Sequence, residues 1–450
     1  MKKILLISPN IPNQMYPQYK IHNLGLLSIA NSTPNKYQVE IFDERLGEKF
    51  DFESHIDKEV ILVGFQALTA NAPIVFELAK KIKRHKIKVV IGGPYVSSIK
   101  DMPKLFNEAI SIFDSILVGE GDLIWPKMIM DLEKNEIKKV YRQKKQSNLE
   151  SLGSYKKDPR INQSQNIILH GKKPNAYGLE KGRGCSFKCD FCGANHVFGE
   201  GYRERNSNDI VKEINSALDK GWDHFYFVDN EFFRHIPKER NKTKILLEKI
   251  KNIPIKRWKT STSLLALKKD KEEGFPLLKL AKKSGLYSVF VGFETISEGR
   301  KGLGKLIKPK TTIRLVREIQ NLGIKVCGYF MFGFDWDSPD VFQSTTKFIL
   351  EADIYKVNLY ILTPLPGTKI WNTLNKQGRI FDKNFLNYTC TRCVFIPKQM
   401  KPSELVNGVI KCHSKLSKKV RGADQLSIRY YAERVFGKGS LPAKHDIAYN

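Results

Sequence analysis

The chain has 450 residues, 41% of them hydrophobic and 11% aromatic, which excludes a disordered protein and favours two folded domains. Its net charge is +29. The basic residues recur along the whole chain at helical spacing and form no recognisable nucleic-acid-binding motif, so we interpret them as solvated helix faces and expect no nucleic-acid partner.

The chain begins with MKKILLISPN, which predicts a first strand rather than a secretion signal. No apolar run reaches the length of a membrane span. We therefore expect a cytoplasmic protein whose cysteines stay reduced, and in that compartment clustered cysteines favour metal binding or redox chemistry.

Residues 1–140 alternate short β-rich runs with helical patterns, such as the helix predicted at 74–85. This alternation predicts a doubly wound, Rossmann-like α/β domain with a parallel sheet. The predicted strands are 3–8, 38–43, 60–65, 88–93 and 115–120.

Three of these strands run into glycine, at Gly64, at Gly92 and Gly93, and at Gly119 beside Glu120. Glycine at the carboxyl end of a strand lets the backbone approach a ligand, and it is equally the usual residue of a tight turn. Residues 141–175 are polar and weakly periodic, and we interpret them as a linker.

The stretch GRGCSFKCDFCGAN then places Cys185, Cys189 and Cys192 within eight positions of a chain that has seven cysteines. No second CxxC pair or histidine pair stands nearby to complete a zinc site, and His196 is the only close candidate. Three thiolates on an iron–sulfur cubane leave one iron open for an outside ligand. The spacing therefore favours an open iron–sulfur cluster.

A second α/β series follows, with predicted helices at 206–221 and 309–323. It predicts a partial or full TIM-like (β/α) barrel over residues 176–390, with its chemistry at the carboxyl ends of the strands. A helical C-terminal extension is expected over 391–450. The predicted barrel strands are 224–229, 288–294, 326–334 and 356–362.

The other cysteines have simpler interpretations. Cys327 lies in an apolar strand and is expected to be a core residue. Cys390 and Cys393 form a CxxC pair that could serve a second metal, with Cys412 as a third ligand, or a redox step, although buried or chemically idle thiols are the favoured interpretation.

The cysteine loop resembles the signature of the radical S-adenosylmethionine (SAM) superfamily, Cys-x3-Cys-x2-Cys with an aromatic residue, here Phe191, before the last cysteine. The resemblance implies that the three cysteines hold a [4Fe-4S] cluster whose fourth iron chelates SAM. It implies a 5′-deoxyadenosyl radical that abstracts hydrogen from a substrate, and a flavodoxin- or ferredoxin-type electron donor. Phe191 would lie along the adenine.

The same resemblance suggests further SAM contacts. Asp229 and Asn230, at the end of a predicted strand, would lie near the methionine part, and Glu294 would reach the ribose hydroxyls. A strand-end carboxylate that caps the next helix is an equally good interpretation of each acid.

The first domain resembles the cobalamin-binding domain of cobalamin-dependent radical SAM enzymes, through NLGLLSIA, VGFQALTAN, VVIGGPYVS and ILVGEGD in that order. The Asp-x-His-x-x-Gly motif that gives cobalt a histidine in other cobalamin proteins is absent after the first strand. By this resemblance the cobalamin-type site would comprise Gly64, Thr69, Gly92, Gly93, Gly119 and Glu120.

The implied activity is methyl transfer from methylcobalamin to an unactivated carbon of an unidentified small-molecule or peptide substrate. One alternative is a cobalamin-independent radical SAM oxidation, rearrangement or cyclisation. Another is a non-catalytic metal-cluster protein that binds nucleic acid through its basic surface.

Overall fold

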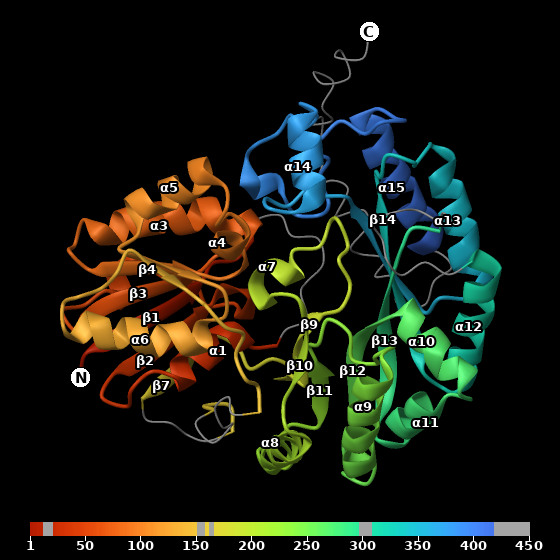
Figure 1. The fold of residues 1–450 in the computed structure, drawn as a ribbon, viewed down its shortest axis with the longest axis horizontal. Helices are drawn as coiled ribbons and strands as arrows, with labels where there is room; N and C mark the ends of the chain where they lie inside the picture. Colours follow the sequence, from red (N-terminus) through yellow and green to blue (C-terminus); the bar gives the residue numbers. More distant parts are fainter. Residues whose placement is uncertain (12–20, 151–157, 162–165, 297–307, 418–450) are drawn as a thin grey trace.

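The computed structural model describes residues 1–11, 21–150, 158–161, 166–296 and 308–417. It has two α/β units side by side, with the cysteine loop and α7 (Ala194–Phe198) between them (Figure 1). No helix in these ranges is long and apolar enough to cross a membrane. The part of the expected C-terminal extension beyond residue 417 lies outside the described residues.

The first unit is a seven-stranded sheet, parallel throughout, in the order β6-β5-β4-β3-β1-β2-β7. All five strands predicted before residue 140 are confirmed. The strands are β1 (Lys3–Ser8), β2 (Gln38–Asp43), β3 (Val60–Gln66), β4 (Lys88–Gly92), β5 (Ser115–Val118), β6 (Val140–Arg142) and β7 (Ile167–His170).

Helices cover both faces of this sheet because its strands are apolar on both sides. In β1, Leu5 and Ile7 face one hydrophobic core and Ile4 and Leu6 face the other. The helices of this unit are α1 (Leu24–Asn31), α2 (Phe52–His55), α3 (Ala72–Lys83), α4 (Pro94–Ser98), α5 (Pro103–Ile112) and α6 (Gly121–Glu133).

The segment predicted as a linker is not a simple connection. Residues 140–142 form an edge strand on β5, and residues 167–170 form the opposite edge strand on β2. These strands are only three and four residues long, too short for a periodic pattern to show against a polar background. The first sheet therefore extends to residue 170.

The second unit is an open sheet of six parallel strands in the order β15-β14-β13-β12-β11-β8, which is the partial form of the predicted barrel. The four predicted strands are confirmed, and β8 and β12 were not predicted. The strands are β8 (Tyr177–Leu179), β11 (His224–Phe227), β12 (Arg257–Ser263), β13 (Leu286–Glu294), β14 (Lys325–Phe332) and β15 (Lys356–Ile361).

Helices line the outside of this curved sheet and bury the largest core of the molecule (Figure 1). α15 continues the wall beyond β15 by packing on α13 and β15. The helices are α8 (Ser207–Asp219), α9 (Pro237–Ile250), α10 (Leu264–Glu272), α11 (Pro276–Lys283), α12 (Pro309–Asn321), α13 (Asp340–Glu351), α14 (Lys369–Lys376) and α15 (Pro402–Ser417).

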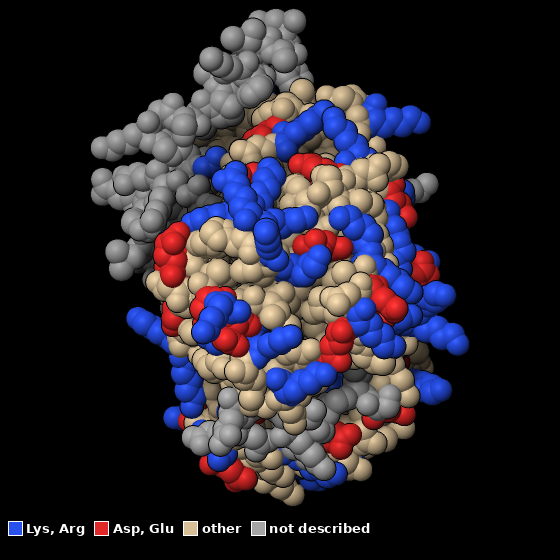
Figure 2. All heavy atoms as spheres, turned by 90° about the vertical axis from the view of Figure 1, so that its left-hand side faces the viewer, with Lys and Arg blue, Asp and Glu red and all other residues tan. Residues whose placement is uncertain are grey.

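Basic side chains are spread over the outer face of the first unit and alternate with acidic ones (Figure 2). On α3, Lys80 pairs with Glu77 at 2.7 Å and Lys81 with Glu53 at 3.3 Å. This face carries solvated helix charges of both signs, as the sequence pattern indicates.

Candidate active site between the two units

The cysteine loop leaves a short antiparallel ribbon of β9 (Gly182–Cys185) and β10 (Gly201–Glu204). Cys185 ends β9 and is buried, Cys189 is partly buried, and Cys192 is exposed. Gly184 has φ +88°, and a Cβ there would lie 2.2 Å from the carbonyl oxygen of Gly201. Glycine before Cys185 is therefore required for the ribbon to close.

Hydrogen bonds from three directions hold this loop. The fully buried Arg234 donates from Nη2 to Ser186 Oγ at 2.6 Å. The backbone N–H of Ile370, in α14, donates to the carbonyl of Asp190 at 3.0 Å, and Asn195 Nδ2 donates to the carbonyl of Phe187 at 3.1 Å. The cysteine loop is thus held both by the segment after β11, which carries Arg234, and by α14 near the end of the second unit.

The three thiols fit a cluster better than a single ion. A tetrahedral zinc with Zn–S bonds near 2.3 Å would hold its sulfurs about 3.8 Å apart. Among described groups of metal-ligating side chains, the set whose ligand atoms all lie within 4.8 Å of one another does not include these cysteines. At least one pair of the three sulfurs therefore lies farther apart than one zinc ion would hold it, which suits the larger cubane, whose iron atoms each take one thiolate.

Two residues implied as SAM contacts lie at the same end of the barrel. The Phe191 ring packs edge-on against Phe334, just after β14, with centroids 6.1 Å apart. Glu294, the last residue of β13, has φ +59°, and the pairing register with β14 shifts beside it. Such a left-handed conformation in a residue other than glycine is uncommon and clusters at functional sites.

Asp229 and Asn230 lie in different surroundings. Asp229 is buried, and its two carboxylate oxygens accept the backbone N–H groups of Lys181 at 3.0 Å and Gly182 at 2.8 Å. Burial raises its pKa to about 7, against the opposing effects of the Lys181 charge and these hydrogen bonds. Its carboxylate thus braces the start of the cysteine ribbon, whereas Asn230 is exposed toward the space between the units.

That space is a cavity of about 270 Å³ between the carboxyl edge of the first sheet and the mouth of the barrel. Gly64, Gly92, Gly93, Gly119 and Glu120 all line it, and Thr69 does not. On the barrel side it is lined by Glu180, Gly182, Arg183, Val197, Phe198, Val228 and Asn230.

In the first sheet β2 and β3 lie on opposite sides of β1, so the strand order reverses there. The cavity lies at the carboxyl end of these strands, which is where doubly wound sheets bind ligands. Its walls are mainly apolar, including Leu6 and Trp125, and no histidine is among the described residues that line it. It fits a ligand with an extended apolar face, and if cobalamin were bound here, no lining imidazole would reach its cobalt.

A buried ion-pair network joins the two units beside this cavity. Arg183 donates from Nη1 to Glu120 Oε2 at 2.9 Å and also to Asp122, while its Nε contacts Glu180 at 2.9 Å. Arg203 reaches the other oxygen of Glu120 at 2.7 Å. Burial alone would raise the pKa of Asp122, but the Arg183 charge and the hydrogen bonds from Arg183 and Ser28 together lower that pKa. Glu120 is therefore a bridge between the units as well as a cavity residue.

The inner face of the barrel is aromatic. Phe290 stacks on Tyr329 with ring centroids 5.7 Å apart, and Tyr329 lies 5.9 Å from Tyr360 on the next strand. Lys259 stands beside them with its Nζ 5.1 Å from the Tyr226 ring, and burial lowers its pKa to about 8. This surface can take a substrate with a flat or apolar body.

Of the remaining cysteines, Cys327 and Cys412 are buried and Cys390 and Cys393 are half-buried. Burial raises the pKa of Cys327 and of Cys393 to about 12 and also raises those of Cys390 and Cys412. Cys393 donates to the Phe395 carbonyl at 3.0 Å, and Cys412 to that of Phe342 at 3.3 Å. Cys393 and Cys412, as thiols that donate to backbone carbonyls, favour the core interpretation over an auxiliary site.

Several site residues escaped the sequence reasoning. Arg183, Asp122 and Arg203 form the interdomain network, and Trp125 and Gln66 line the cavity. Arg183 stands inside the quoted GRGC stretch, so its position was visible. Its partners Glu120 and Asp122 lie some 60 residues away in sequence, and only the fold brings them together.

Comparison with known proteins agrees with this geometry. The sequence profile of the Radical SAM superfamily matches residues 179–349. The chain is 26% identical over 430 residues to bacteriochlorophyllide d C-12(1)-methyltransferase of Chlorobaculum tepidum, covering 93% of this chain and 88% of that protein. It is 24% identical over 420 residues to hopanoid C-3 methylase of Methylococcus capsulatus, covering 90% and 78%.

Among solved structures, the fold is similar to that of the cobalamin-dependent S-adenosylmethionine radical enzyme OxsB with aqua-cobalamin and S-adenosylmethionine bound. The TM-score is 0.70 at 14% identity, over 96% of this chain and 71% of that one. The likeness extends over both units, so the arrangement of an α/β sheet before a partial barrel is shared by the two proteins.

Proposed function

Because this chain belongs to the radical SAM superfamily, we propose that it is a cobalamin-dependent methyltransferase that adds a methyl group to an unactivated carbon. One observation carries the proposal. The segments on both sides of the cysteine loop, Gly182–Arg183 and Val197–Phe198, line the same cavity as the glycine-rich strand ends of the first sheet. A group in that cavity and a cluster on the loop would share one wall.

The residues of this chain would have distinct parts. Cys185, Cys189 and Cys192 would hold the [4Fe-4S] cluster, and Phe191, Asn230 and Glu294 would contact SAM. With both bound, the site would supply a radical able to take hydrogen from carbon.

The cavity beside the loop would hold cobalamin, which would supply the methyl group. Gly92 and Gly93 would let its ring lie against the strand ends, and the apolar wall with Leu6 and Trp125 would exclude water from it. The Arg183 network would fix the position of the cysteine loop relative to the cavity.

The substrate would approach from the barrel side, over the aromatic inner face formed by Phe290, Tyr329 and Tyr360. Methylases of a tetrapyrrole and of a hopanoid match this chain at nearly equal identity, so its relatives share the chemistry more than the substrate. A small molecule with an extended apolar body suits this surface. An external flavodoxin- or ferredoxin-type protein would supply electrons.

Anaerobic reconstitution tests the proposal. The protein should bind about four irons per chain, retain added corrinoid through gel filtration, and release 5′-deoxyadenosine when reduced with SAM. Cys185→Ala, Cys189→Ala and Cys192→Ala should each abolish deoxyadenosine formation, whereas Cys327→Ala, which removes a core thiol, should not. A cluster that forms deoxyadenosine but never retains corrinoid would favour a cobalamin-independent oxidation, rearrangement or cyclisation instead.

A further inference from the structure

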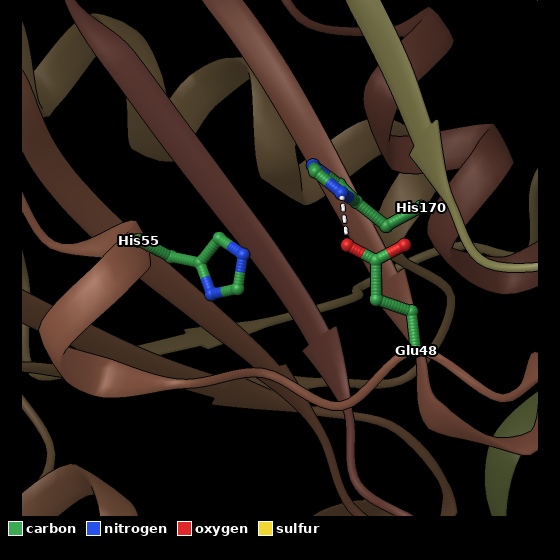
Figure 3. Close-up of side chains that lie close together, drawn as sticks. All are labelled: Glu48, His55 and His170. Atoms are coloured by element: carbon green, nitrogen blue, oxygen red, sulfur yellow. Dashed lines mark hydrogen bonds and ion pairs between the residues drawn. The ribbon is translucent and has the colours of Figure 1, made fainter.

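A second constellation of metal-ligating side chains lies at the β2–β7 edge of the first sheet, away from the cysteine loop (Figure 1). Glu48 follows the 3-10 turn η1 (Glu44–Leu46), His55 ends α2, and His170 ends β7. One ligand atom from each of the three lies within 4.8 Å of the others. Figure 3 shows both imidazole rings and the carboxylate directed toward one common point.

The two rings are held by the same phenylalanine. Phe42 is fully buried in β2 and is the register partner of His170 in β7. Its ring stacks on that of His170 with centroids 3.9 Å apart and lies 4.6 Å from the ring of His55. The imidazoles are thus oriented before any ion binds.

The hydrogen bonds of the rings leave Nε2 of His55 for an ion, and at His170 an ion would replace the hydrogen bond between Nδ1 and Glu48. The Nδ1 of His55 lies 2.8 Å from the carbonyl of Asp51, so its Nε2 faces the other two side chains (Figure 3). The Nδ1 of His170 lies 2.9 Å from Glu48 Oε1, and its Nε2 lies 2.9 Å from Glu40 Oε2.

Glu40 orients the His170 ring through a hydrogen bond to its Nε2. A histidine that ligates a metal commonly donates its other N–H to a carboxylate, which fixes the tautomer and the ring orientation. Glu40 stands in that position toward His170 and is itself held by Gln38 Nε2 at 3.0 Å and by Lys3 at 3.7 Å. Glu48 is anchored in turn because its second oxygen accepts the backbone N–H of Gly171 at 3.0 Å.

We propose that Glu48, His55 and His170 bind one divalent transition-metal ion of the zinc class, which joins the β2–α2 connection to the end of β7. Two imidazoles and one carboxylate are a common protein ligand set for Zn²⁺, with a fourth position open to water. Tetrahedral zinc separates such ligand atoms by about 3.3 Å, so small side-chain rotations close the site.

The ion would have a structural effect that the proposed chemistry does not require. β7 is an edge strand of four residues, and the chain leaves it directly for β8 of the barrel. An ion at its end would tie this crossing to the turn that precedes α2. The site is thus independent of SAM, the cluster and cobalamin.

Zinc binding to the protein with its cluster in place tests this inference, because the cysteines are then occupied. Equilibrium dialysis with Zn²⁺ and elemental analysis should give one zinc per chain in addition to the cluster iron. His55→Ala and His170→Ala should each weaken binding by about 100-fold, and Glu40→Gln by about 10-fold. His224→Ala is the matched control, because His224 pairs with the carboxylate of Asp223 but belongs to no group of three metal-ligating side chains among the described residues.

His55→Ala is the decisive variant, since it leaves the hydrogen bond between His170 and Glu48 intact. Zinc should also protect the amides of residues 44–57 and 166–171 from hydrogen exchange in the wild-type protein and not in this variant. Equal zinc content in the wild type and His55→Ala, or no retained zinc in either, would mean that His170 only bridges two carboxylates, and would overturn the inference.

Discussion

Arg183, two residues before Cys185, donates to Glu120 Oε2 at 2.9 Å across the boundary between the two units. The Glu120 side chain is 1% exposed and that of Arg183 is 12% exposed, so the pair is shielded from solvent. Because Arg183 also contacts Asp122, its loss would leave the buried Asp122 carboxylate without its cation and Glu120 with Arg203 alone. These buried ion pairs therefore join the strand ends of the first sheet to the ribbon that carries the cysteine loop.

Arg183→Met should lower the stability of the protein by about 3 kcal/mol or more, the usual effect of breaking a buried ion pair from one side. It should also reduce corrinoid retention, since the cavity wall carries this residue. Thermal unfolding and corrinoid content measure both effects. Arg314→Met removes an arginine that is 78% exposed from a surface pair with Glu318, and it should change neither. Equal effects of the two substitutions would contradict the proposed link.

A pH dependence follows from Asp229, whose pKa is about 7 in the folded protein and near 3.8 without burial. Since the folded state favours the protonated acid, its stabilising contribution is complete below about pH 4 and is lost as the pH rises through about 7. The Tm difference between wild type and Asp229→Asn should therefore fall from pH 5 to pH 8. The exposed Asp219→Asn serves as the control, and a parallel Tm profile for Asp229→Asn would contradict the burial argument.

The cavity can be filled without disturbing the cysteines. A Cβ on Gly92 would meet Leu117 Cβ at 3.6 Å, an ordinary contact, so Gly92→Ala should be tolerated. Gly92→Leu should place a larger side chain among the cavity residues and abolish corrinoid retention while about four irons per chain remain. Iron analysis and the corrinoid absorbance of the same sample measure this. Corrinoid bound at wild-type levels by Gly92→Leu would place cobalamin elsewhere.

The CxxC pair outside the cluster loop should not carry iron. Cys393 donates to the Phe395 carbonyl and burial raises the pKa of both thiols, as in a packed core, so the double substitution to alanine should leave iron content and deoxyadenosine formation unchanged. Replacing Cys189 and Cys192 instead should remove both. A loss of iron in the Cys390/Cys393 variant, at unchanged Tm, would indicate an auxiliary cluster.

The sequence by itself determined the elements whose signal is local. Apolar runs identified nine strands, because strands of a parallel sheet are buried on both faces and read as continuous hydrophobic stretches. The spacing of Cys185, Cys189 and Cys192 indicated an open cluster, since ligands on one loop lie close together whatever surrounds them. The glycines at 64, 92, 93 and 119 pointed to the ligand edge of the sheet because parallel strands end at the same edge.

Only the tertiary structure decided what depends on contacts between distant segments. The short edge strands β6 and β7 form because a neighbouring strand supplies their hydrogen bonds, which no local pattern records. Asp229 proved to accept two backbone N–H groups, and Glu120 proved to pair with two arginines. The sequence identified both carboxylates as candidate site residues. Their hydrogen-bond partners lie 47 or more positions away in sequence, and only folding brings them close.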